Sequence, residues 1–286
     1  MANKIKFVLK QGKESLELGS GSDFGILDYS GIEASDYTLS LEDNAQLDGA
    51  TIAGKKVEPR PITIKAEYRK TDKEDKIRQK IIKFFNPKKS GELTVTFGNI
   101  TRKIGYEIEG SPQIEERNIF RALRFSVNLL CPAPYFQDVE TFAKNMAGVR
   151  GLLAFPLVFP PRGLVTSYRE MQQVAVFNNK GDKAIGLNVL FEAKGGGVTN
   201  PVLYNLSTGE FLRVEIVMNK GDKLTICTIP GKKRVELNGE NAIQYIDRNS
   251  RFFAIAEGET LLKYDADEGR QNLDVYPRYT PEYLGV

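Results

Sequence analysis

Residues 60–87 read RPITIKAEYRKTDKEDKIRQKIIKFFNP, a strand pattern followed directly by a helix pattern. In the first half, Ile62, Ile64 and Ala66 alternate with polar residues, which is the period of a half-buried strand. In the second half, four apolar residues recur at helical spacing: Ile77, Ile81, Phe84 and Phe85. The stretch therefore predicts a strand and then a helix that rests on a sheet.

Local signals set the ends of this helix. Thr71 with Glu74 fits a capping box, and acidic residues crowd the first turn, where the helix dipole favours them. Pro87 stops the helix because the residue before a proline avoids the helical region. We predict one amphipathic helix over about 72–85, whose exposed Lys and Arg side chains most simply form a solvated face.

The rest of the chain follows a period of two. Apolar residues alternate in the runs 5–9, 93–97, 104–108 and 123–129, and again after residue 173 in the runs 174–176, 187–191, 212–218, 224–226, 235–237 and 273–275. Gly, Asn and Asp turns separate the runs, and no second helical stripe intervenes. This pattern favours a mainly β protein with two sandwich-like or barrel-like domains, of which the first carries the helix.

The proline distribution predicts where the domains divide. Five of the 13 prolines fall within residues 131–162. We predict a first domain over 1–140, an extended Pro-rich connection over 141–172 and a second β-sandwich over 173–286. The longest apolar run is broken by prolines and is too short for a bilayer, so we expect no membrane segment.

Composition narrows the possible chemistry. The chain has 286 residues and contains no His, no Trp and two Cys. The lack of His excludes His-based triads and His-type metal sites, and two Cys are too few for a disulfide scaffold. A Gly-rich loop at 19–25 lacks the features of a phosphate loop, and the acidic turn at 265–268 departs from a calcium loop. We expect no enzyme activity and no catalytic, cofactor-binding or metal-binding residues.

Charge is balanced overall but not locally. The formal net charge is +3, which argues against a dedicated nucleic-acid binder. Residues 1–54 carry a net charge of −5, whereas residues 55–103 carry +9. Two interpretations stay open: the segments pair inside one domain, or they lie on opposite sides of a head-to-tail contact between copies.

Glycan binding is a second possible function, because β-sandwiches often bind sugars against aromatic rings. Trp, a common stacking residue, is absent, although Tyr204, Tyr245 and Tyr264 could substitute for it.

A set of ordered segments resembles a known family. Three groups carry the resemblance: Cys131, Pro132, Pro134 and Tyr135 at the end of the first domain; Phe155, Pro156 and Pro160 in the connection; and Asn178, Gly181 and Asp182 at the start of the second domain. The order and spacing of these groups, with the RPITI strand, are similar to those of the phage distal tail protein family of long-tailed phages and prophages.

The resemblance implies a structural virion protein that is assembled in the host cytoplasm. The first domain would form a homohexameric ring that joins the tail-tube protein to the tail-tip or baseplate protein and to receptor-binding parts. The second domain would be galectin-like. Galectin sugar sites use His and Trp, which this chain lacks, so a galectin-like shape does not imply sugar binding. A glycan-binding adsorption module of the tail is the alternative.

The Pro-rich connection leads to a first testable prediction. Limited proteolysis of the folded chain should cut first between Glu140 and Arg169, because loops between folded domains are preferred cleavage sites. Mass spectrometry of the early fragments would locate the cut, and a first cut inside residues 5–130 would contradict the domain boundary.

Overall fold

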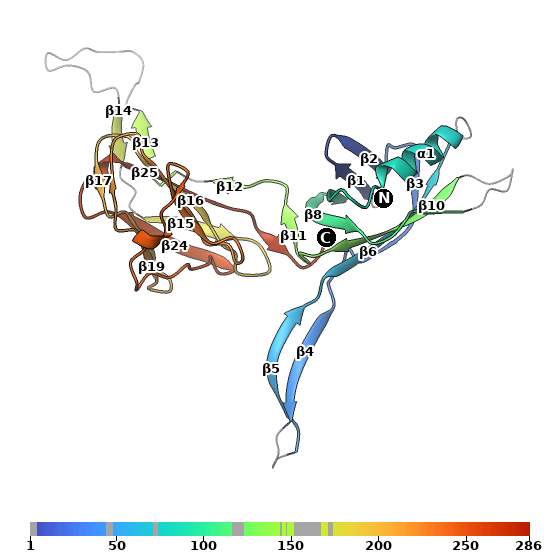
Figure 1. Cartoon of the computed structure of the whole chain (residues 1–286), viewed down its shortest axis with the longest axis horizontal. Helices are drawn as coiled ribbons and strands as arrows, with labels where there is room; N and C mark the ends of the chain where they lie inside the picture. Colours follow the sequence, from blue (N-terminus) through green and yellow to red (C-terminus); the bar gives the residue numbers. More distant parts are fainter. Residues whose placement is uncertain are drawn as a thin grey trace. The chain divides into compact units, whose positions relative to one another are not determined.

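The protein folds as two compact units (Figure 1). The structure, a computed structural model, describes residues 5–43, 48–70, 74–115, 123–143, 145–146, 148–151, 167–170 and 174–286. Unit 1 consists of residues 1–139 together with 282–286, and unit 2 consists of residues 140–281. The predicted mainly β fold with one α-helix is confirmed for the described residues.

The last residues of the chain belong to a different unit from the one that the sequence pattern predicts. The sequence assigned 173–286 to one domain, but residues 282–286 pack in unit 1. The short strand β12 (Phe142–Ala143), in the predicted connection, pairs with a strand of unit 2. Residues 155, 156 and 160 of that connection lie outside the described residues.

The described residues of unit 1 form one continuous main sheet, one helix and a separate two-stranded sheet. The main path of the sheet runs in the order β2-β1-β7-β8-β10-β6-β3, and β9, β11 and β26 pair at its sides. The elements of unit 1 are β1 (Ile5–Gln11), β2 (Glu14–Gly19), β3 (Phe24–Ser30), β4 (Tyr37–Asp43), β5 (Ala50–Val57), β6 (Arg60–Tyr68), α1 (Glu74–Phe84), β7 (Gly91–Phe97), β8 (Ile100–Ile108), β9 (Gln113–Ile114), β10 (Arg124–Cys131), β11 (Phe136–Asp138) and β26 (Glu282–Tyr283).

The strand and helix of residues 60–87 form the centre of this unit. Strand β6 buries every second residue from Arg60 to Tyr68, and its neighbour β10 pairs with it in antiparallel register. Helix α1 presents Ile81 and Phe84 to the core, and Phe85, just after the helix, packs its ring 6.1 Å from that of Phe125. The strand and helix patterns thus bury one shared apolar core, which confirms the predicted helix.

The C-terminal residues complete unit 1. Tyr283 of β26 pairs with Phe136 of β11, and the backbone N–H of Val286 donates to the carbonyl of Ile32 at 2.9 Å. Gly285 passes so close to the backbone of Glu33 that an added Cβ would lie 1.9 Å from its carbonyl oxygen. Only a residue without a side chain fits there.

Strands β4 and β5 form a two-stranded sheet of their own, the β4–β5 ribbon (residues 37–57). The ribbon projects from the main sheet between the end of β3 and the start of β6 (Figure 1). The register shifts between Ser40 and Leu41, which marks a bulge in the ribbon.

The described residues of unit 2 form two larger sheets and two small ones. One sheet has the order β12-β25-β16-β21-β22-β23 and the other β15-β24-β18-β19. Besides β12, its elements are β13 (Gly148–Gly151), β14 (Ser167–Glu170), β15 (Val174–Asn179), β16 (Asn188–Ala193), β17 (Val198–Thr199), β18 (Val202–Asn205), β19 (Phe211–Arg213), β20 (Val217–Met218), β21 (Lys223–Cys227), β22 (Arg234–Leu237), β23 (Glu240–Asn241), the short 3-10 helix η1 (Ile243–Tyr245), β24 (Gly258–Asp265), the short 3-10 helix η2 (Arg270–Asn272) and β25 (Leu273–Tyr279).

In strand β15 of unit 2, the residues that face the core are not the valines. Ala175 and Phe177 of β15 are buried, whereas Val174 and Val176 are exposed. Both faces of this strand are apolar, so alternation alone does not reveal which face the core takes.

Gly285 provides a test of the C-terminal return. We expect Gly285→Val to displace residues 282–286 and to destabilise unit 1 by about 2 kcal/mol, since the added side chain meets backbone that cannot yield. Hydrogen exchange would detect the displacement as faster exchange of the amides in β11 and of the Val286 amide, which donates to the carbonyl of Ile32. The matched control is Gly110→Val, because a Cβ at Gly110 meets no atom within 4 Å; equal effects of the two substitutions would contradict the prediction.

Candidate assembly site

The β4–β5 ribbon carries a row of large apolar side chains in solvent. Tyr37, Leu39 and Leu41 lie at alternate positions of β4 and are 58%, 52% and 60% exposed. Ile52 of β5 pairs with Leu41, so it lies on the same face, and it is 50% exposed. Val57, opposite Tyr37, continues the row toward the sheet. Lys55, opposite Leu39, shares this face. We call the five apolar residues the apolar ribbon face.

The opposite face of the ribbon is polar. Thr38, Ser40 and Glu42 alternate with the apolar residues of β4, and Lys56 pairs with Thr38. A two-stranded hairpin is only marginally stable in water by itself, and exposed apolar patches on a folded protein usually mark interaction surfaces. The amphipathic ribbon thus has the character of a sheet that lacks its covering layer.

Charge in unit 1 is partly neutralised inside the unit. Strand β3, from the acidic segment, pairs with β6, from the basic segment. Lys65 lies 3.1 Å from Asp28, and Lys70 lies 2.7 Å from Asp23. The two oppositely charged segments therefore meet as neighbouring strands, as one of the two interpretations of the charge pattern predicted.

Other charges of these segments find no such pairing. Glu42, Asp43 and Asp48 flank the far end of the ribbon and are exposed, and within the described part of the chain none of them forms an ion pair. We call these three residues the acidic tip.

The outer surface of α1 has the opposite sign. Lys76, Arg78, Lys80 and Lys83 are exposed, and Asp75 is the single exposed acid among the helix residues whose side chains the structure describes. Lys88 and Lys89 follow in the next turn. We call the four helix cations and these two lysines the cationic helix surface; Ile82, 47% exposed, lies among them.

A buried arginine ties the ends of several segments together. Arg60 is 1% exposed. Its Nε donates to the carbonyl of Pro134 at 2.8 Å, and its Nη1 donates to the carbonyls of Gly31 at 2.8 Å and Glu33 at 3.1 Å. Its Nη2 donates to the carbonyl of Leu284. Burial lowers the pKa of Arg60 below its usual value, but a guanidinium stays charged in proteins.

The surroundings of Arg60 reinforce this arrangement. The guanidinium carbon lies 4.9 Å from the ring centroid of Phe136, and that of Arg102 lies 3.5 Å from the ring centroid of Tyr283. Arg102 also donates to the carbonyl of Gly285. Two arginines of unit 1 thus hold residues 282–286 in place.

The first group of predicted motif residues clusters beside Arg60. Cys131 ends β10 and is buried, and burial raises the pKa of its thiol to about 12. Pro134 supplies a carbonyl to Arg60, whereas Pro132 is exposed and Tyr135 is half-buried. This group of motif residues therefore has a structural role, because it forms the loop whose carbonyl accepts a hydrogen bond from Arg60.

The last group of predicted motif residues lies in unit 2. The backbone N–H of Gly181 donates to Oδ1 of Asn179 at 3.0 Å, which stabilises the turn after β15. The carbonyl of Asn178 accepts from the hydroxyl of Tyr279, and Asp182 is exposed in the turn. These residues form a turn and a strand end, in a different unit from the first group.

Sequence reasoning overlooked the role of Arg60 and the ribbon, although signals for both are present. Arg60 shares the parity of Ile62 and Ile64, so its place in the alternation marks it as inward-facing. Tyr37, Leu39 and Leu41 alternate as in any half-buried strand. This alternation does not show whether the surface that covers the apolar face belongs to the same chain or to another copy.

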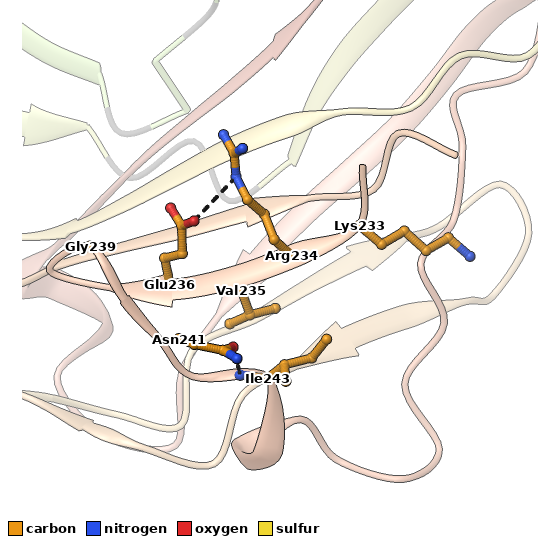
Figure 2. A pocket seen from close by; sticks show the side chains of 7 residues that line it. All are labelled: Lys233, Arg234, Val235, Glu236, Gly239, Asn241 and Ile243. Carbon is orange, nitrogen blue, oxygen red and sulfur yellow. Dashed lines mark hydrogen bonds and ion pairs between the residues drawn. The ribbon is translucent and has the colours of Figure 1, made fainter. Parts of the chain in front are cut away.

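A hollow in unit 2 has little capacity to bind a ligand. It has a volume of about 350 Å³ and lies beside β22 and β23. Figure 2 shows Arg234 paired with Glu236 on one side of β22, while Asn241 and Ile243 lie on the other side. Lys233 extends away from both groups (Figure 2). The polar groups do not converge on one point.

The acidic turn of unit 2 is occupied by its own cations. Asp265 lies 3.3 Å from Lys263 and 3.4 Å from Arg270, and Asp267 pairs with Arg213. No cluster of three or more acidic, Cys or His side chains that could hold a metal occurs among the residues described.

The three tyrosines considered for sugar stacking lie in different environments. Tyr264 is buried, and Tyr245 is exposed in η1. Tyr204 packs against Phe211 with ring centroids 6.1 Å apart, and Nζ of Lys263 lies 5.7 Å from the Tyr204 ring centroid. They do not form one platform.

The outer face of the four-stranded sheet in unit 2 carries a group of exposed apolar side chains. Val176 pairs directly with Leu261, and Leu206 donates its backbone N–H to the carbonyl of Leu261. Val174, Val176, Leu206 and Leu261 are 41–47% exposed. This group, the apolar sheet patch, is a second surface suited to contact with another protein.

Comparison with known families covers most of the chain. Residues 13–131 match the phage tail protein RIFT-related domain, and residues 180–283 match the siphovirus-type tail component, C-terminal domain. The chain belongs to the phage distal tail protein family. This family membership makes the protein a structural component of the phage tail, found in the virion. Among curated proteins, none matches the chain.

A solved structure shares the fold of this tail protein. The crystal structure of phage SPP1 Dit (gp 19.1), described as a paradigm of the hub adsorption apparatus in phages that infect Gram-positive bacteria, superposes with a TM-score of 0.66 at 14% identity over 97% of this chain and 99% of that chain. The activated phage P2 baseplate with Ca gives a TM-score of 0.48 at 9% identity over 97% and 98%. No helix in the described parts of the tail protein is long and apolar enough to cross a membrane.

Removal of the Arg60 guanidinium tests its structural role in this tail protein. We expect Arg60→Met to lower the free energy of unfolding of unit 1 by about 3 kcal/mol or more, because four backbone carbonyls lose their donors. Thermal and urea unfolding followed by tyrosine fluorescence would measure the loss. Arg102→Met, which removes a more exposed arginine that donates to the carbonyl of Gly285, should cost less; the reverse order would contradict the assignment.

Proposed function

We propose that the protein is a distal tail hub in which unit 1 forms a closed homohexameric ring at the end of the tail tube. The ring would join the tail-tube protein to the tail-tip or baseplate protein and to receptor-binding parts. The number six comes from the family resemblance. The observation that carries the proposal is the apolar ribbon face, which the folded chain leaves exposed.

The ribbon has the features of an arm that binds a neighbouring copy. It spans seven to eight residues per strand, or about 25 Å at the usual rise of about 3.3 Å per residue. Burying each half-exposed side chain of its apolar face would contribute about 1 kcal/mol. An arm that binds a different surface on the next copy makes a head-to-tail contact, which closes into a ring when the rotation permits.

Unit 2 supplies a surface for the other partners. The apolar sheet patch lies on a sheet whose inner side is filled by its own core. We assign this patch to contacts with the tail-tip protein or with receptor-binding parts, because it is apolar and exposed and serves no purpose within its own sheet.

The glycan-binding alternative has weaker support. A sugar site requires an aromatic ring whose face is open and has polar groups nearby. Lys263 lies over the Tyr204 ring, Tyr264 is buried, and the polar groups around the hollow beside β22 point apart. The galectin-like form predicted for unit 2 is accordingly assigned to protein contacts.

The ring proposal is tested with substitutions on the two faces of one ribbon. The full-length chain should form particles of about six times 32.0 kDa with a six-fold ring in electron micrographs. Leu39→Asp with Leu41→Asp should abolish these particles, because the charges prevent burial of the apolar ribbon face.

The control uses the polar face of the same ribbon. Thr38→Asp with Ser40→Asp adds the same two charges at neighbouring positions of β4 and should leave assembly intact. Mass photometry over a range of concentrations measures both variants. A wild-type chain that stays monomeric at high concentration, or equal loss in both variants, would contradict assembly through the apolar face.

A further inference from the structure

We infer that the cationic helix surface of one copy is the docking site for the acidic tip of the β4–β5 ribbon of the next copy. This inference rests on the proposed ring and deepens it, because it assigns the surface that receives the end of the arm. Three features support it: complementary charge, complementary apolar contact and the separation of the two surfaces within one chain.

The ribbon end combines apolar and acidic groups on one face. Asp43 follows Leu41 at the next alternate position of β4, so its side chain extends the apolar ribbon face with a charge. Ile52 lies opposite Leu41 on that face. Glu42 and Asp48 add two more carboxylates at the same end. A partner for this end needs an apolar contact point surrounded by cations.

Helix α1 offers that combination. Ile82 is 47% exposed although the inner side of the helix is fully packed, so it serves no purpose in the core of unit 1. Arg78 lies one turn before Ile82, and Lys83 follows it directly. Lys76 and Lys80 lie a turn apart on the flank of the helix that leads to Lys83. Asp75 alone opposes these cations among the helix side chains described.

The two surfaces do not meet inside one molecule. The ribbon projects away from α1 within unit 1 (Figure 1). The ion pair of Lys65 with Asp28 neutralises other charges of these segments. It lies between β3 and β6 and involves neither surface. The unneutralised parts of the acidic and basic segments can therefore meet only between copies.

Electrostatic attraction and apolar burial have different roles in this contact. Exposed ion pairs contribute little each and are screened over about 8–10 Å near physiological salt. The apolar ribbon face would hold the copies together, while the tip and the helix would set the direction and register of docking. Salt should therefore slow ring formation more than it dissociates finished rings.

The first test exchanges the charges of the two surfaces. One variant carries Glu42→Lys, Asp43→Lys and Asp48→Lys, and the other carries Lys76→Glu, Lys80→Glu and Lys83→Glu. Each alone should raise the concentration for half-maximal ring formation at least tenfold at low salt, and the chain with all six changes should return to within about threefold of wild type. Single-surface variants that assemble like wild type would overturn the docking site while leaving the ring proposal intact.

The second test detects the contact without a closed ring. Chains with Asp48→Cys are mixed with chains with Lys80→Cys under mild oxidation, and disulfide-linked heterodimers are counted. The native thiols Cys131 and Cys227 are buried and do not compete. Cross-linking should exceed that of a Lys10→Cys control, which presents an exposed residue of β1, at least fivefold. Equal yields would overturn the inference, even if rings form by another contact.

Discussion

Arg60 holds unit 1 closed. Its guanidinium spreads one buried charge over four backbone carbonyls, from the end of β3, from the loop after β10 and from the C-terminal residues. A buried charge is tolerated only when its donors are satisfied, so these segments must come together for the arginine to be buried at all. Residues 282–286 are therefore part of unit 1, although the whole of unit 2 separates them from it along the chain.

This arrangement explains the order of the chain. Unit 2 occupies residues 140–281, between two segments of unit 1, and is in effect an insertion near the end of the first domain. The chain leaves unit 1 after β11 and returns as β26, which pairs with β11. An insertion between paired strands leaves the core of the host unit undisturbed, because both ends of the inserted segment start from adjacent positions.

The hollow beside β22 offers no convergent polar site, which directs attention to surfaces. The hollow beside β22 is lined by groups that pair with one another or point apart, and the acidic turn of unit 2 is neutralised locally. The conspicuous unsatisfied features are the apolar ribbon face and the charges at its end and on α1. These exposed surfaces are where the proposed contacts between copies would form, in keeping with membership of a tail protein family.

Local patterns in the chain suffice to identify its elements and its family, but they leave open which faces are covered. Alternation at Ile62, Ile64 and Ala66 identifies a strand, because the pattern reports a local backbone period, and the ordered loop residues around Cys131 point to the distal tail family. Val174 belongs to an alternating pattern like that of a buried strand, yet it is exposed, because period two reports two faces and not what lies against them. The four carbonyls around Arg60 likewise come from segments far apart in the chain. Such contacts depend on how separate segments pack together, and no local pattern encodes that packing.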